Sequence, residues 1–372
     1  MQIGVVRMPK VFKGYNLAYK GRSGMVFKKG QGYKLPERED IFSYGFHGSV
    51  SALDVFGAYP PSTSVYGTAT ITGKLVSRPD SLYTLGTIAG TEIRIKDFLS
   101  IEELITAAIN QMKYRERADL KKWKSSPFGT DPVDYRVLDL EDKILTYSTE
   151  DNCHRVPGRI LVSKVCKGEA VVRGIRSVAI TKKRESVSMA TNDNSVAMSE
   201  GVLSTAFTVG NNSLAKASGC GGVAVAVHEW PKSVALGGNS LSASSGFAAS
   251  SEVNGYCSIA VAQGDKSSTV CTKRDSVAIS VGFMSTAEAK CGRSVAITVG
   301  ECSAVRGVRG SILTIVIFEN SRHNWTPFTC TGLVDDIKLL SNTWYTVPAK
   351  DKMGFRKNEF IPVGKGNAPD VL

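Results

Sequence analysis

The sequence predicts a mainly β protein built around a β-roll, a solenoid in which two nine-residue half-turns make one eighteen-residue coil. Three observations predict it. A nine-residue unit repeats without insertion over residues 177–311, for example as SVAITKKRE from Ser177 and SVAITVGEC from Ser294. Small and apolar residues alternate within each unit, which is the period of a strand. Nine of the fifteen units carry Gly at position 7, where it supplies a turn, and a strict short period is typical of a solenoid.

The repeat divides the chain into four segments. They are an N-terminal α+β module (1–118), a linker followed by strands that lead into the roll (119–167), the β-roll itself (168–311) and a small C-terminal β cap (312–372). Nine residues are too few to close a coil, so each coil is expected to hold two short strands that belong to two different sheets.

The C-terminal cap is expected to close the roll with larger residues than the repeats contain. The run ILTIVIF from Ile312 predicts a buried strand by its length and β-branching. An uncapped roll would expose unpaired strand edges. Residues 332–340, 344–347 and 360–363 are predicted to continue the cap as a small β-meander.

The N-terminal module combines short strands with one helix. Alternating runs at residues 64–75 and 91–95 predict strands, and apolar residues at helical spacing predict a helix over 101–116. Ser100 and Glu103 form a capping box at its start. The aromatic and basic residues of the module form the candidate partner-binding surface, in which His47 is expected to be packed and hydrogen-bonded rather than catalytic. This surface comprises Lys13, Tyr15, Tyr44, Phe46 and His47.

The two faces of the roll are predicted to differ. Positions 1, 3 and 5 of each unit hold Ser, Ala and other small residues, so they are expected inside, and positions 2, 4 and 6 outside. In the units that begin at 186, 204, 222, 240, 258, 276 and 294 the outward residues are apolar, whereas in the intervening units they become polar towards the C-terminal end. The predicted apolar face comprises Val187, Met189, Phe207, Val209, Val223, Val225, Val227, Leu241, Ile259, Val261, Val277, Ile279, Val281, Val295, Ile297 and Val299.

A sheet of this length with an apolar outward face is expected to be covered. Either a flanking module folds back over it, or copies of the chain pack their apolar sheets about a common axis; we favour the second, because the stripe is long and the flanking modules are short. The Ser-Val-Ala-Ile pattern resembles the β-roll heads of trimeric autotransporter adhesins, which implies a homotrimer. Those proteins carry a signal peptide and a membrane anchor that have no counterpart here, so their adhesin function is not carried over.

The order of motifs along the chain resembles a family of uncharacterised bacteriophage proteins, which carry a similar module ahead of alanine-rich repeats. The matching motifs are Phe12-Lys13-Gly14-Tyr15-Asn16, Gly45-Phe46-His47, Leu53-Asp54-Val55-Phe56, Leu99-Ser100-Ile101-Glu102-Glu103-Leu104 and Thr343-Trp344-Tyr345. Gly48 stands where many relatives have a Cys, which argues against a Cys/His site. The resemblance implies a viral origin and no particular catalytic activity.

The remaining sequence features do not indicate a catalytic or metal-binding site. The four histidines are dispersed, the eight cysteines contain no CxxC pair, and the repeat turns lack the Asp that calcium-binding rolls need. No cofactor or metal is therefore expected, and the cysteines fit a reduced cytosolic protein. The N-terminus lacks the apolar stretch of a signal peptide, and no apolar run is long enough to span a membrane. The net charge of +12 favours acidic partners, but the basic run 113–124 lacks the aromatic pattern of a nucleic-acid groove.

These observations predict a non-enzymatic, phage-encoded oligomeric binding protein in the cytoplasm of an infected bacterial host. Its partners are expected to be copies of itself, as a trimer, and a host or viral protein such as a factor of anti-phage defence. One alternative is a structural component of the virion, such as a tail-fibre or decoration protein. Another is an enzyme housed in the N-terminal module.

Overall fold

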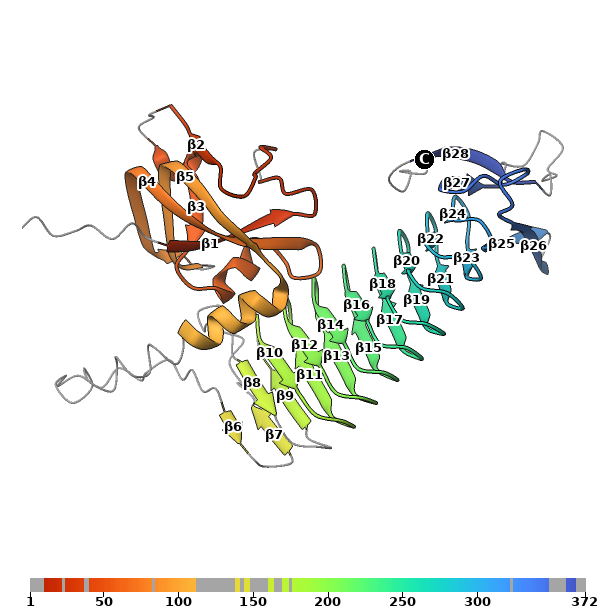
Figure 1. Cartoon of the computed structure of the whole chain (residues 1–372), viewed down its shortest axis with the longest axis horizontal. Helices are drawn as coiled ribbons and strands as arrows, with labels where there is room; N and C mark the ends of the chain where they lie inside the picture. Colours follow the sequence, from red (N-terminus) through yellow and green to blue (C-terminus); the bar gives the residue numbers. More distant parts are fainter. Residues whose placement is uncertain are drawn as a thin grey trace, which may run out of the picture. The chain divides into compact units, whose positions relative to one another are not determined.

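The computed structural model of the chain is mainly β, with 52% of residues in strands and 7% in helices, so the predicted fold class is confirmed (Figure 1). The structure describes residues 10–21, 24–36, 40–81, 84–111, 138–140, 144–147, 160–163, 169–173, 176–321, 324–347 and 359–365. The chain divides into two compact units. The first holds the N-terminal module, and the second holds nearly all of the solenoid together with the C-terminal strands.

The N-terminal module is a small antiparallel barrel. Its strands are β1 (Lys10–Asn16), β2 (Gly32–Lys34), β3 (Phe46–Ser49), β4 (Ser64–Ser81) and β5 (Thr84–Leu99). They lie in the order β2-β5-β3-β1-β4, and β4 also pairs with β5, which makes the order of the last four strands cyclic. The barrel core contains Val11, Tyr15, Phe27, Phe46, Ala69, Ile71, Ile93 and Ile95.

Short helices accompany the barrel. They are α1 (Ile41–Tyr44), the 3₁₀ helix η1 (Leu53–Gly57) and a helix over residues 101–111. The predicted capping box is confirmed, because the Glu103 carboxylate accepts from the Ser100 N–H at 2.7 Å and the Ser100 hydroxyl accepts from the Glu103 N–H at 3.2 Å. The predicted end of this helix at residue 116 lies outside the described residues.

The solenoid consists of two parallel sheets whose strands alternate along the chain (Figure 1). The repeat strands of the odd sheet are β7 (Ile144–Tyr147), β9 (Glu169–Arg173), β11 (Val187–Thr191), β13 (Thr205–Val209), β15 (Val223–Val227), β17 (Leu241–Ser245), β19 (Ile259–Gln263), β21 (Val277–Val281), β23 (Val295–Val299) and β25 (Ile312–Ser321). Those of the even sheet are β6 (Leu138–Leu140), β8 (Ile160–Ser163), β10 (Val178–Thr181), β12 (Val196–Ser199), β14 (Leu214–Ala217), β16 (Lys232–Ala235), β18 (Ser250–Val253), β20 (Ser268–Cys271), β22 (Thr286–Ala289) and β24 (Ala304–Gly307).

The register confirms the eighteen-residue coil. Neighbouring strands of one sheet pair residues that lie eighteen apart, as Val223 pairs with Leu241 in the odd sheet and Leu214 with Lys232 in the even sheet. The sheets also begin earlier than the predicted start of the roll at residue 168. Strands β6, β7 and β8 already belong to them, although the spacing from β7 to β9 departs from eighteen residues.

The interior of the solenoid is built from small side chains, as the alternation predicts. Positions 1, 3 and 5 are buried along the whole roll, with Ala206, Ala260 and Ala296 fully inaccessible. Cys271 stands at position 5 and is also fully buried, and burial raises the pKa of its thiol to about 12. Ser and Ala allow the two sheets to approach closely, because neither side chain extends far from the backbone.

The Ser at position 1 connects successive coils by hydrogen bonds. The Ser258 hydroxyl is fully buried, accepts from the Ser240 N–H at 3.1 Å, and lies 3.2 Å from the carbonyl oxygen of Gly237. The same pattern recurs at Ser276, which accepts from the Ser258 N–H and donates to the carbonyl of Gly255 at 2.9 Å. Each of these hydroxyls is the acceptor for a buried backbone N–H of the preceding coil.

The turns depend on two backbone conformations. Position 7 of the odd-sheet units has a positive φ, as at Gly264 (φ +126°). A Cβ at Gly264 would collide with the carbonyl oxygen of Gly246, so Gly is required there. The residue at position 9 has φ near +55° in nearly every unit, although it is rarely Gly. Examples are Leu203 (+56°), Trp230 (+54°) and Met284 (+56°). The backbone N–H of each of these three residues donates to a carbonyl of the next coil at 2.8–3.0 Å, which offsets the strain.

The C-terminal strands end the parallel stack with antiparallel pairs. They are β26 (Asn324–Leu333), β27 (Thr343–Thr346) and β28 (Ile361–Lys365). β26 pairs with β25, β27 with β24, and β28 with β27.

Two predictions about the cap are wrong. The run from Ile312 is not buried throughout but alternates, with Leu313, Ile315 and Ile317 buried and Ile312 and Phe318 exposed by 42% and 47%. This follows because one face of β25 continues the outward face of the odd sheet. Residues 332–340 do not form a strand beyond Leu333, because the Asp335 carboxylate accepts from the N–H groups of Ile337 and Lys338, each at 2.8 Å, and holds a turn.

We expect the Ser258→Ala substitution to lower the free energy of unfolding by about 1–3 kcal/mol, because it leaves the buried N–H of Ser240 without its hydrogen-bond acceptor. Ser268→Ala is the matched control, since Ser268 points outward from β20 and is partly exposed; it should change stability by less than about 0.5 kcal/mol. Urea unfolding followed by circular dichroism measures both, and equal effects would contradict the structural role of position 1.

We expect Leu203→Gly to raise the free energy of unfolding by roughly 0.5–1 kcal/mol, because Gly adopts the left-handed conformation without the Cβ strain. The Leu203 side chain is 58% exposed and contributes little burial. Leu203→Ala removes the same side chain but keeps the strain, so it should not stabilise the protein in the same unfolding experiment.

Candidate functional site

The outward side of the odd sheet is a continuous apolar face. On strands β11 to β23 the outward residues form three columns, at positions 2, 4 and 6, that run across the sheet in register. The column at position 2, for example, contains Val187, Thr205, Val223, Leu241, Ile259, Val277 and Val295. All sixteen residues of the predicted apolar face lie on these columns. Val187, Leu241 and Ile259 are exposed by 37%, 37% and 43%, so solvent reaches the face.

The apolar face is large and carries no charge. Seven strands at a spacing of about 4.8 Å, each with about 17 Å of extended chain, give a face on the order of 600 Å². This is at the upper end of the apolar patches that soluble monomers expose. Seven strands with three outward positions each give twenty-one positions, and none of them holds Asp, Glu, Lys or Arg. Thr191, Ser245 and Gln263 are among its few polar residues.

The even sheet presents a different outward surface. Lys232 on β16 lies 3.8 Å from Glu252 on β18, and Glu288 on β22 lies 2.6 Å from Arg306 on β24. The Arg306 guanidinium also stacks 4.5 Å from the centre of the Trp344 ring. The first outward residues of the even sheet, such as Val178, Val196 and Leu214, are apolar and buried. The two outward faces of the roll therefore differ in charge towards its C-terminal end.

An aromatic group lies at the turns that follow the odd-sheet strands. Trp230 and Phe247 contact each other edge to face at 5.5 Å, and the Lys266 ammonium lies 5.8 Å from the Phe247 ring. Trp230, Phe247 and Phe283 are exposed by 44%, 41% and 46%. The sequence did not indicate this group, because positions 8 and 9 of the unit have no regular residue type.

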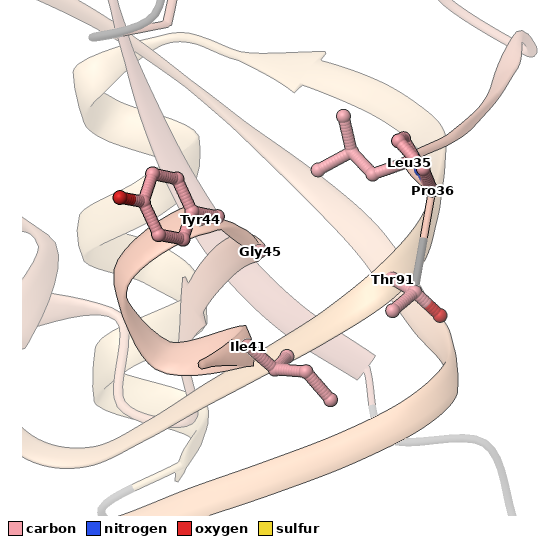
Figure 2. A pocket seen from close by; sticks show the side chains of 6 residues that line it. All are labelled: Leu35, Pro36, Ile41, Tyr44, Gly45 and Thr91. Atoms are coloured by element: carbon pink, nitrogen blue, oxygen red, sulfur yellow. The ribbon is translucent and has the colours of Figure 1, made fainter. Parts of the chain in front are cut away.

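The second candidate site is a cavity in the N-terminal module. A cavity of about 860 Å³ opens between β1, α1, β3, the residues that follow η1 and the segment that precedes β2. A smaller pocket of about 180 Å³ next to α1 is lined by Leu35, Pro36, Ile41, Tyr44, Gly45 and Thr91 (Figure 2). Leu35, Tyr44 and Gly45 line both hollows, so the two adjoin along α1.

The structure gathers four of the five residues of the predicted binding surface around the large cavity. Lys13, Tyr44, Phe46 and His47 line it. Tyr15 does not, and its inclusion in the binding surface is corrected: its side chain is fully buried in the barrel core, where burial raises the pKa of its hydroxyl well above the usual value. The expectation that His47 is packed and hydrogen-bonded is confirmed, because its Nε2 lies 2.5 Å from the carbonyl oxygen of Phe42 and its ring meets the Phe42 ring edge to face.

The other predicted features can be placed only in part. Within the described ranges, no three His, Cys, Asp or Glu side chains lie close enough together to hold a metal ion. The cysteines at 220, 257, 271, 291, 302 and 330 are free thiols. None of the helices among the described residues has the length and hydropathy needed to cross a membrane. The basic run 113–124 lies outside the described residues.

Comparison with protein-family models, curated proteins and solved structures finds no match for this chain. The resemblances to bacteriophage proteins and to adhesin heads therefore stay predictions, and the proposals below are argued from the geometry of the two candidate sites.

Proposed function

We propose that this chain is a binding protein that functions as a homo-oligomer, in which the apolar face of the odd sheet is buried between copies. The observation that carries the proposal is the uninterrupted run of uncharged outward residues over seven consecutive strands. Exposing such a face to water is unfavourable by about 25 cal/mol for each Å² of apolar surface, so covering the face contributes favourably to association.

A second copy of the chain is the occupant that fits the face best. The columns repeat at the strand spacing of about 4.8 Å, and a copy of the same sheet has the same spacing over the same length. The surface of an unrelated globular partner would not repeat at the spacing of these seven strands. The chain carries a net charge of +12, so copies repel one another elsewhere, and a face without charges is where they approach at least cost.

A ring of three copies is the arrangement that we propose for this contact. In a parallel trimer, the column at position 2 of one copy packs against the column at position 6 of the next, and position 4 lies towards the axis. The largest residues at position 2 are Leu241 and Ile259, and the same layers carry the polar residues Ser245 and Gln263 at position 6. A contact between two different columns is heterologous, and it closes into a ring of three when neighbouring copies are related by one third of a turn.

The partner of the assembly is proposed to be a protein of an infected bacterial host, with inhibition of a defence factor as one such role. Support for this comes from the resemblance of the motif order to bacteriophage proteins. Mass spectrometry of purified phage particles distinguishes it from the alternative of a virion component, since a protein that acts only inside the host should be absent from the particle.

We expect light scattering coupled to size exclusion to give a mass of three times 39.9 kDa for the intact chain at micromolar concentration. Val225→Asp and Ile279→Asp, each in the central column, should reduce the mass to that of a monomer, because a buried carboxylate without a partner is very unfavourable.

The matched control for this experiment is Ser268→Asp, which introduces the same charge on the outward side of the even sheet. It should leave the mass unchanged. A monomeric mass for the unmodified chain, or dissociation by Ser268→Asp as readily as by Val225→Asp, contradicts the proposal.

A further inference from the structure

The large cavity of the N-terminal module has the dimensions of a small-molecule site. Its volume of about 860 Å³ falls within the range of about 300–1,000 Å³ that is usual for ligand pockets. Its lining comes from separate segments of the chain, which the barrel and α1 hold in place. Phe27 and Phe46 belong both to this lining and to the barrel core, so the inner wall of the cavity is formed by core residues.

Aromatic rings line the cavity from several directions. They are contributed by Phe12, Phe27, Phe42, Tyr44, Phe46 and Tyr59. The rings of Phe27 and Phe46 meet edge to face at 6.1 Å, which fixes their orientation. Glycine makes room for this arrangement at Gly14, where a Cβ would collide with the Tyr59 ring. Aromatic walls of this kind favour a flat ring, because stacked and edge-to-face contacts are both available to it.

The charge of the lining is positive. Lys13 is only 8% exposed; its ammonium donates to the carbonyl oxygen of His47 at 3.1 Å and lies 5.4 Å from the centre of the Phe27 ring. His47 is the other titratable basic residue of the lining, and the described lining contains no Asp or Glu. A lysine that is largely removed from water attracts an anion more strongly than an exposed one, because less solvent screens the interaction.

We propose that this cavity binds a small molecule that combines a planar aromatic ring with an anionic group. The ring lies among the aromatic side chains, and the anion lies at the Lys13 ammonium. Nucleoside monophosphates and aromatic carboxylates share this chemistry, and the cavity has room for either. The site lies in a different unit of the chain from the apolar face, so ligand binding and self-association can be tested separately.

The test is isothermal titration of the full chain with adenosine monophosphate and, in parallel, with 2-naphthoate. We expect at least one of them to bind to the unmodified chain, and Lys13→Gln to weaken that binding by about tenfold or more, since a charge-assisted hydrogen bond is lost. Lys10→Gln is the matched control, because Lys10 lies exposed on the same strand and does not line the cavity; its affinity should equal that of the unmodified chain.

A second variant keeps the test decisive if Lys13→Gln does not fold. Tyr44 lines the cavity but is 61% exposed, so Tyr44→Ala should fold normally, and we expect it to weaken binding at least severalfold. Binding of adenosine monophosphate alone identifies a phosphate ligand, and binding of 2-naphthoate alone identifies a carboxylate. If neither molecule binds, or if the cavity variants bind as tightly as Lys10→Gln, the proposal is wrong.

Discussion

The close approach of the two solenoid sheets is the constraint on which the rest of the roll depends. Only Ser, Ala, Thr and Cys fit at most interior positions, and these side chains bury little apolar surface compared with Leu or Ile. The coils are therefore held mainly by hydrogen bonds, in the parallel ladders of each sheet and at the position-1 serines such as Ser258. Larger apolar residues are rare inside, with Val253 and Val305 among the exceptions. On the odd sheet the larger apolar residues lie on the outward side. The narrow interior and the apolar face are therefore two parts of one packing arrangement.

If copies associate as proposed, the contact between them contributes to the stability of the fold as well as to function. A roll with an interior of Ala and Ser gains little from the hydrophobic effect, whereas a contact over the outward columns adds Phe207, Ile279 and Ile297 to a dry interface. For a repeat protein whose coils contact only their neighbours, an interface along the whole length also couples coils that do not otherwise touch. The even sheet, with its Glu288–Arg306 pair, cannot supply the same gain.

The periodic part of the fold could be predicted from the sequence, and the parts that depend on backbone geometry or distant pairing could not. Alternation within the unit assigned the interior and the outward faces. The left-handed position 9 was not predicted, because Leu203, Trp230 and Met284 are not residues that favour it, and hydrogen bonds to the next coil impose it. The barrel was not predicted either, since its closure requires β4 to pair with both β1 and β5, and the pattern indicated only two separate runs. The turn at Asp335 likewise depends on a local carboxylate that interrupts an apparent strand.

The cavity shows how much of a site a sequence can indicate. Its lining residues come from segments that local patterns treat separately, so its volume could not be foreseen. Lys13 nevertheless carried a signal. It stands between Val11 and Tyr15 at the spacing that puts alternate residues on one side of a strand, and those two residues belong to the barrel core. A lysine in register with core residues is rarely tolerated without compensation. In this barrel the compensation includes the His47 carbonyl and the aromatic faces of Phe27 and Tyr15, which hold the ammonium at the cavity where we propose that an anion binds. If the solenoid joins three copies, three such cavities belong to one particle, and a ligand that carries several aromatic anions gains avidity without any new contact.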